Sequence, residues 1–244
     1  MRKPMRIFAI ESPSALDILD KKTESNTLAT ICGMLEHQFA STLVRSKTEF
    51  ETAIAHVTSI NESFLARRQQ GMPLCLHIAA HGNKDGLALG PTDASWSYLA
   101  SKLRAFSRSM NHYSGPLLLV LSACGANHQE ITDYFQDYVK EDKNFRPALY
   151  VFTTVGNEED NVYWHDSIIA WSIFYHQIAT VVLSERKDIM TILDKIKIVG
   201  AGELQYFRWD ETREQYFGYQ SKHSEHKHSN GLTSSRSRRS RART

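Results

Sequence analysis

The alternation of short apolar runs with longer helical patterns is the feature that most restricts how this 244-residue chain can fold. Strand-like runs cover residues 5–10, 42–46, 73–80, 115–123 and 147–155, and amphipathic helical patterns separate them over 26–40, 48–68, 95–109, 129–138 and 161–183. This order is typical of parallel strands joined by crossover helices. The run "GPLLLVLSA" is apolar at successive positions, which indicates a strand buried on both faces. The sequence therefore predicts an α/β fold, with a mostly parallel central sheet flanked by helices on both faces.

The C-terminal part of the chain adds a helix and a hairpin to this fold and ends in a segment of different composition. "RKDIMTILDKIKIV" predicts a helix, and "QYFRWDETREQYFGY" predicts an aromatic-rich antiparallel hairpin. From Ser221 onward the chain is mainly Ser, His, Lys and Arg, with seven Lys or Arg residues against Glu225 alone. Such a segment cannot bury enough apolar surface to offset the entropy of ordering it. We therefore expect one domain over 1–220 and a disordered basic tail over 221–244.

The placement of charges and cysteines indicates the expected cellular location and partners. Cys32, Cys75 and Cys124 are far apart without CxxC spacing, and charges interrupt any apolar run at the N-terminus, so a reducing, cytoplasmic location is expected. The longest apolar stretches fall short of the about 20 residues that a membrane span needs, so no membrane partner is expected. The basic tail could bind nucleic acid by counterion release, but exposed basic runs do so without specificity.

Two predicted strands end in residues that carry chemistry. His81-Gly82 follows "LCLHIAA", and Cys124-Gly125 follows "LLLVLSA". Ligands bind outside the carboxyl ends of parallel strands. Consecutive βαβ strands are usually neighbours about 4.8 Å apart, which would place the two ends roughly 5 to 10 Å from each other. We therefore expect an imidazole and a thiol to face one reacting atom.

This pair of side chains suits acyl transfer. A positioned imidazole can deprotonate a thiol and later protonate a leaving amine. Gly82 leaves room for a substrate, and its N–H, with that of Cys124, could donate to the oxygen that becomes negative in the tetrahedral intermediate. Each element is weak alone, since a buried cysteine is more often an inert small hydrophobe. Their combination at two strand ends, 43 residues apart, predicts His81 as base and acid, Cys124 as nucleophile and Gly82 as oxyanion donor.

Other candidate ligands have simpler explanations. His77 lies four residues before His81, a spacing that makes a metal pair on a helix but not on a strand. On a strand both side chains share one face with Cys75, His77 lying deeper, so we expect His77 to be buried and hydrogen-bonded and Cys75 to be packing. No metal and no cofactor are predicted. Helical spacing also places three tryptophans in the core: Trp96, Trp164 and Trp171.

At these strand ends the sequence resembles the caspase-like cysteine peptidases, the clan of caspases, metacaspases, legumain, gingipains and separase. The caspase signature Gln-Ala-Cys-Arg/Gln/Gly-Gly has its histidine about 50 residues upstream. "SACGA" keeps Ala-Cys-Gly, with Ser122 in place of the leading Gln and Ala126 in place of the final Gly. "LSAC" and "GLALG" are closer to the bacterial CHAT domains. The resemblance covers residues 5–185 and implies the caspase-like fold and a His81–Cys124 dyad, generally without an essential third acid.

The same resemblance implies a substrate pocket and a biological setting. In this clan the pocket is lined by loops after the first and fifth strands and by the residue two before the cysteine, which here are Glu11, Ser122, Glu158, Glu159 and Asp160. Acids there favour Lys or Arg before the cut. Residues 158–160 could equally be a solvated helix start. The resemblance implies an endopeptidase acting on protein or peptide substrates, as a regulated effector in defence or cell death with an activating protein partner.

Two other functions stay open at this point. The chain could be an inactive caspase-like scaffold that recruits partners, because fold and catalysis are separable. It could also be a doubly wound nucleotide-binding or signalling domain, which the βα order alone permits. Against the latter, "ESPSALD" follows the first strand, where a GxGxxG or GxxxxGK[ST] phosphate loop would be required.

Overall fold

The central feature of the structure, a computed structural model that describes residues 3–61, 71–125, 130–155 and 162–221, is a seven-stranded sheet of order β10-β9-β8-β7-β3-β1-β2. The strands β2, β1, β3, β7 and β8 are parallel, and β9 and β10 form the predicted antiparallel hairpin. Their bounds are β1 (Arg6–Ser12), β2 (Gln38–Leu43), β3 (Leu74–Ala80), β7 (Leu117–Ser122), β8 (Tyr150–Thr154), β9 (Leu204–Asp210) and β10 (Gln215–Gln220). The apolar strand β7 lies at the middle of the sheet, as its sequence predicts.

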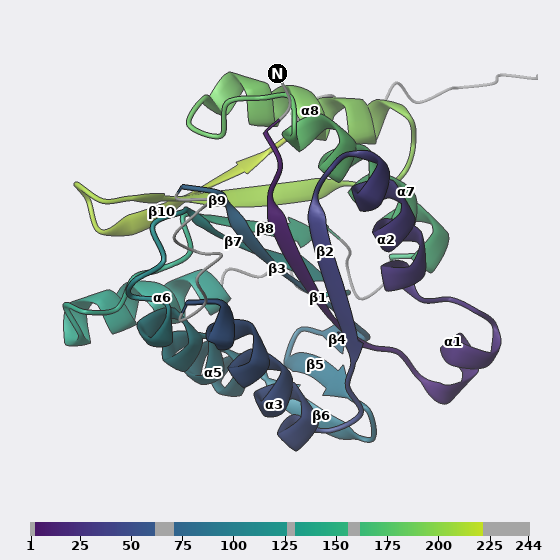
Figure 1. The fold of residues 1–244 in the computed structure, drawn as a ribbon, viewed down its shortest axis with the longest axis horizontal. Coiled ribbons are helices and arrows are strands. Elements are labelled where there is room, and N and C mark those ends of the chain that lie inside the picture. The colour runs from purple at the N-terminus through teal and green to yellow at the C-terminus, as the bar shows by residue number, and fades with distance from the viewer. Residues whose placement is uncertain (1–2, 62–70, 126–129, 156–161, 222–244) are drawn as a thin grey trace, which may run out of the picture.

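Helices cover both faces of this sheet, which confirms the predicted fold class (Figure 1). One face carries α2 (Glu24–Met34), α7 (Trp164–Ile178) and α8 (Arg186–Ile198). The other face carries α3 (Lys47–Thr58), α5 (Trp96–Ser109) and α6 (Glu130–Glu141). Alternate strand residues point to opposite faces, so each strand contributes to both layers.

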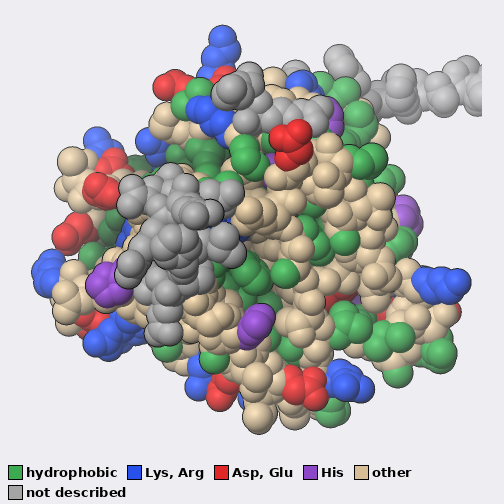
Figure 2. All heavy atoms as spheres, viewed as in Figure 1, with side chains coloured by type: hydrophobic (Ala, Val, Ile, Leu, Met, Phe, Trp, Pro, Cys, Tyr) green, Lys and Arg blue, Asp and Glu red, His purple; other side chains and the backbone are tan. Residues whose placement is uncertain are grey.

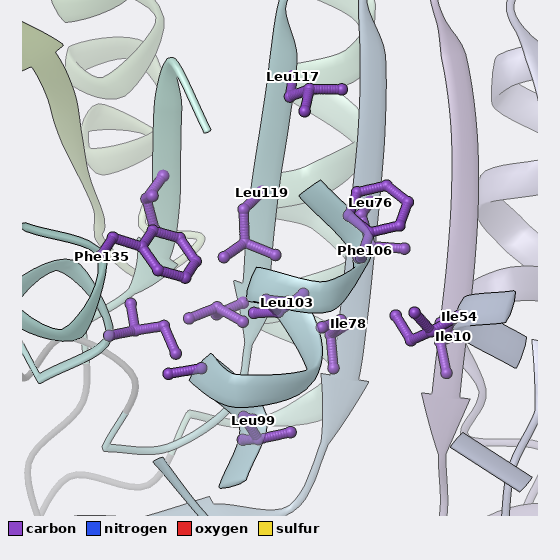
Figure 3. Close-up of a cluster of buried hydrophobic side chains, with 14 of the residues drawn as sticks. Ile10, Ile54, Leu76, Ile78, Leu99, Leu103, Phe106, Leu117, Leu119 and Phe135 are labelled. Carbon is purple, nitrogen blue, oxygen red and sulfur yellow. The ribbon is translucent and has the colours of Figure 1, made fainter. Parts of the chain in front are cut away.

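The layer under α5 shows how the strands and helices meet. Figure 3 shows Ile78 and Leu119 of the sheet beside Leu103 of α5, with Phe135 of α6 next to them. On β3, Leu74, Leu76 and Ile78 belong to this core, whereas Cys75 belongs to the core under α2 and α7. His77, two residues after Cys75, therefore points to the face covered by α2 and α7. The same alternation decides which face each residue at the end of β3 points to.

Two small elements follow the strand ends. The predicted hairpin after β3 is a three-stranded sheet of β4 (Gly82–Asn83), β5 (Gly86–Leu89) and β6 (Thr92–Ser95). After β1 comes α1 (Ala15–Leu19), which the sequence pattern does not predict and which buries none of its residues. Figure 2 shows hydrophobic side chains gathered where α1 lies, and Leu16 and Leu19 are 71% and 76% exposed. A short 3-10 turn, Ser59–Asn61, follows α3.

Some predicted boundaries are wrong. The helix expected over 26–40 ends at Met34, because Glu36 adopts φ 63° and the next residues form β2 beside β1, so Phe39 is a strand residue. The second strand is thus 38–43 rather than 42–46. The long predicted helix ends at Ile178, not at 183. Ser221, assigned to the tail, is buried and donates to Asp194 at 2.6 Å, whereas 222–244 lie outside the described residues.

No helix within the described ranges combines the length and the apolar character that a bilayer-spanning segment needs.

Candidate active site

The carboxyl ends of β1, β3 and β7 lie side by side. In the register of these strands Glu11 is opposite Ala79, and Ala79 is opposite Ser122. The predicted adjacency of the strands that precede His81 and Cys124 is confirmed, because β3 and β7 pair directly. These residues line a pocket of about 110 Å³ that α1, α2 and α7 complete; its other lining residues are Ser12, Pro13, Asp17, Lys22, Glu24, Ala80, Ala123, Val162, Trp164 and Ser167.

The side chains of His81 and Cys124 both line this pocket. The His81 side chain is 65% exposed, and its Nε2 is 2.7 Å from Asp17 Oδ2. Cys124 is partly exposed, whereas Cys32 and Cys75 are buried. Burial raises the pKa of each of those two thiols to about 12. Cys124 is therefore the thiol of this chain that a substrate can reach.

His81 and Cys124 are each followed by a glycine because the backbones at these two positions pack closely against each other. A Cβ on Gly82 would lie 2.6 Å from the carbonyl oxygen of Cys124 and 3.0 Å from Ala123 Cβ. Gly125 has φ 73°, and a Cβ there would overlap the carbonyl of Asn83. The chain after β3 and the chain after β7 thus pack backbone against backbone, an approach that only glycine permits. Gly82 thus lies beside Cys124, and its oxyanion role stays a prediction.

The floor of the pocket holds a carboxylate that sequence reasoning missed. Glu24, in the first turn of α2, is buried, and its Oε1 accepts hydrogen bonds from Ser122 Oγ at 2.7 Å and Ser167 Oγ at 2.6 Å. Its Oε2 lies 2.9 Å from His77 Nε2. Trp171 Nε1 donates to Ser122 Oγ at 2.8 Å. An acid at a helix start usually complements the helix dipole, so no pattern in the sequence distinguishes Glu24 from an ordinary helix-start acid.

Glu11 lines the pocket as predicted but also has a structural task. Its Oε1 accepts from the Glu24 amide at 2.6 Å, and its Oε2 accepts from the Ser25 amide at 3.1 Å. The residue at the start of α2, Thr23, makes no side-chain cap of its own. Glu11 therefore caps α2 from the end of β1 and fixes the position of Glu24. Glu11 thus both lines the pocket and holds the start of α2.

The remaining predictions have mixed outcomes. His77 is buried and hydrogen-bonded as expected, with Nδ1 2.8 Å from the Tyr175 hydroxyl. Cys75 packs in the core. Trp96 and Trp171 are core residues, and Trp164, at the start of α7, packs partly buried against the core and also lines the pocket. Among the described residues no group of three or more His, Cys, Asp or Glu could hold a metal ion.

The acids predicted after the fifth strand, Glu158, Glu159 and Asp160, lie outside the described residues. The part of the pocket that the structure describes therefore obtains its acidic character from Glu11, Asp17 and Glu24. Lys22 is a cation in the same lining, and its Nζ pairs with Asp20 at 2.8 Å.

No protein-family model and no curated protein matches this sequence. Among solved structures, the crystal structure of caspase-1 from Spodoptera frugiperda is similar to this chain, with a TM-score of 0.45 and 12% identity over 80% of this chain and 75% of that chain.

Proposed function

We propose that this chain is a cysteine endopeptidase in which Cys124 is the nucleophile and His81 is the general base and acid. The observation that carries the proposal is the joint position of a reachable thiol and an exposed imidazole at adjacent strand ends, on one pocket. The other two thiols of the chain are buried and held protonated by their raised pKa values. The enzyme function thus depends on a single accessible cysteine.

The proposed reaction proceeds in two balanced halves. His81 takes the Cys124 proton as the sulfur attacks the carbonyl carbon of the scissile peptide bond. The C–N bond then breaks, His81 gives that proton to the leaving amine, and a thioester on Cys124 remains. Water, deprotonated by His81, attacks the thioester, which releases the acid and restores the thiol. Each half passes through a tetrahedral intermediate with a negative oxygen. The N–H groups of Gly82 and Cys124 would stabilise that oxygen in both halves, by about 3 to 4 kcal/mol per donor.

We propose that the pocket selects Lys or Arg before the cut. Glu11 and Glu24 are buried acids at its floor, and the donors that the structure gives them are backbone amides, hydroxyls and an imidazole. A guanidinium or ammonium would add a full positive charge to this acidic surface. Lys22 opposes this preference weakly because its charge is paired with Asp20.

Active-site labelling tests the nucleophile. A peptidyl probe with Arg beside a thiol-reactive group should label Cys124 in the wild type and should fail to label His81→Ala. Peptide mapping after labelling checks the site, and Cys32 and Cys75 serve as internal controls. Equal labelling of all three cysteines, or labelling that is independent of His81, would exclude the dyad.

Paired substrates test the specificity. The ratio of kcat/KM for an Arg peptide over the matching norleucine peptide should fall at least tenfold in Glu24→Gln, which keeps the side-chain shape and removes the charge. Glu36→Gln is the matched control, because Glu36 is an exposed acid just past the end of the same helix. A preference for acidic or apolar residues in the wild type would contradict this part of the proposal.

The two rival functions make different predictions. An inactive scaffold would show no turnover of any peptide library and no His81-dependent labelling. A nucleotide-binding domain would need positive charge or free amides at the strand ends, whereas Glu11 and Glu24 stand there and repel phosphate. The resemblance to caspase-like peptidases further supports a regulated effector, cytoplasmic and controlled by a protein activator, in a defence or cell-death pathway. Expression of wild type and Cys124→Ala in the same cells would test that role.

A further inference from the structure

We propose that Asp17 is a positioning residue that orients His81, so that the catalytic centre works as a Cys124–His81–Asp17 triad. This inference rests on the proposed peptidase function. The resemblance to caspase-like peptidases implies a dyad that generally lacks an essential third acid, and no motif in the sequence singles out Asp17.

The contact itself is direct. Asp17 Oδ2 lies 2.7 Å from His81 Nε2, and the carboxylate is much less exposed than the imidazole, at 21% against 65%. A ring that is so exposed has little packing to fix its χ angles, so this hydrogen bond is its main restraint. The bonded nitrogen carries the proton because a carboxylate only accepts. Nδ1 is then the nitrogen with a lone pair, and it is the atom that takes the proton from the Cys124 thiol.

The carboxylate is itself held in place. The same Oδ2 accepts from Ser14 N at 2.9 Å and from Ser14 Oγ at 2.5 Å, and Ser14 Oγ accepts from the Asp17 amide at 3.1 Å. This capping box starts α1 shortly after the end of β1, so the acid lies on the helix that follows a strand lining the pocket. Burial raises the pKa of Asp17, but the hydrogen bonds from Ser14 and His81 outweigh it and leave the pKa lowered, so the carboxylate stays ionised at neutral pH.

An opposite role for the same contact must be separated by experiment. If the Asp17 bond held the imidazole away from the thiol, it would be a latch, and its removal would raise turnover. The charged groups that share the pocket are Lys22, Glu11 and Glu24, and Asp20 pairs with Lys22. Among the described residues none of these groups has a hydrogen bond to the His81 side chain, so a change at Asp17 acts on the ring without a competing charged partner.

The test is Asp17→Asn in the full chain, with peptide turnover measured against pH. The amide can offer Nε2 a donor and so stabilise the wrong tautomer, and kcat should fall by about 100-fold or more while KM stays within about twofold. The pH dependence of kcat/KM should also change, and Asp17→Glu should recover part of the loss. Unchanged or increased turnover in Asp17→Asn would overturn the inference.

A matched control separates positioning from support of α1. Ser14→Ala breaks the capping box but leaves the carboxylate on His81, so kcat should stay within about threefold of the wild type. A loss as large as that of Asp17→Asn would mean that Asp17 acts only through α1.

A readout without turnover keeps this inference distinct from the peptidase proposal. The ¹⁵N shifts of His81 at neutral pH should report a proton on Nε2 in the wild type and a mixture or reversal of tautomers in Asp17→Asn. If the wild type has this tautomer but cleaves nothing and Cys124 resists the probe, the proposed function fails while the contact stands. If the tautomer is the same in both proteins, the positioning role fails.

Discussion

Replacement of Gly82 by alanine tests the geometry at the centre of the site. The added Cβ would lie 2.6 Å from the Cys124 carbonyl oxygen. Carbon and oxygen rarely approach closer than about 3.3 Å, so the two backbones must separate by about 0.7 Å. The end of the Leu87 side chain, whose Cδ2 would lie at 3.0 Å, can turn aside, but the backbone of Cys124 and the Cβ of Ala123 cannot. The substitution therefore moves the residue that carries the nucleophile.

The substitution should reduce the catalytic rate much more than it reduces the stability of the fold. Overpacking of this kind costs about 1–3 kcal/mol of unfolding free energy. A misplacement approaching 1 Å in a catalytic constellation can cost about 100-fold in rate, and crowding of the oxyanion position adds to that loss. We expect kcat/KM to fall at least 100-fold in a protein that remains fully folded at 25 °C.

Urea unfolding and peptide turnover on the same samples provide the measurement. Gly218→Ala is the matched control, because that glycine lies on β10 far from the pocket and its added Cβ would meet side-chain atoms, the nearest being Phe207 Cε1 at 3.1 Å. The control should lose modest stability and keep its turnover. Wild-type activity in Gly82→Ala would remove Gly82 from the mechanism, and a rate loss fully explained by the unfolded fraction would reduce Gly82 to a packing residue.

Three further outcomes follow from the described contacts. Cys124→Ser and His81→Ala should each abolish peptidase activity and shift the thermal midpoint by no more than about 2 °C, since both side chains line an accessible pocket; a loss that tracks unfolding in calorimetry would contradict this. Cys32→Ala should lower the free energy of unfolding by about 1–2 kcal/mol with near-normal turnover, because Cys32 of α2 is fully buried in the core that α2 shares with α7. The lowered pKa of Asp17 means that its ionised form stabilises the folded state above the ordinary value of 3.8 and loses that effect as pH falls through the depressed folded value. The stability difference between wild type and Asp17→Asn should thus be constant near neutral pH and vanish in acid; urea titrations across pH would refute it by showing no dependence.

The elements that can be predicted from the sequence are those whose residues are buried, because burial leaves an apolar pattern. The apolar runs of β3 and β7 identify central parallel strands, and topology then places His81 and Cys124 at neighbouring strand ends. The edge strand β2 was misplaced because its residues are largely exposed and lack that apolar signal. Glu24 and Asp17 were missed for another reason. Their partners lie far away in sequence, His77 by 53 residues and His81 by 64, and no local pattern encodes such contacts.

The helix α1 buries none of its residues, so the rim of the pocket that it forms is locally less stable than the pocket floor. Its floor is tied to the sheet core through Glu11 and Glu24, but the rim that carries Asp17 contributes no apolar burial, as the hydrophobic side chains left in the open in Figure 2 show. Local opening of α1 therefore requires the loss of a few polar bonds rather than the global unfolding free energy. Amides of residues 15–19 should exchange with solvent far faster than those of β3. On warming, such a molecule loses the order of its catalytic rim at temperatures where its sheet and both helical layers are still intact.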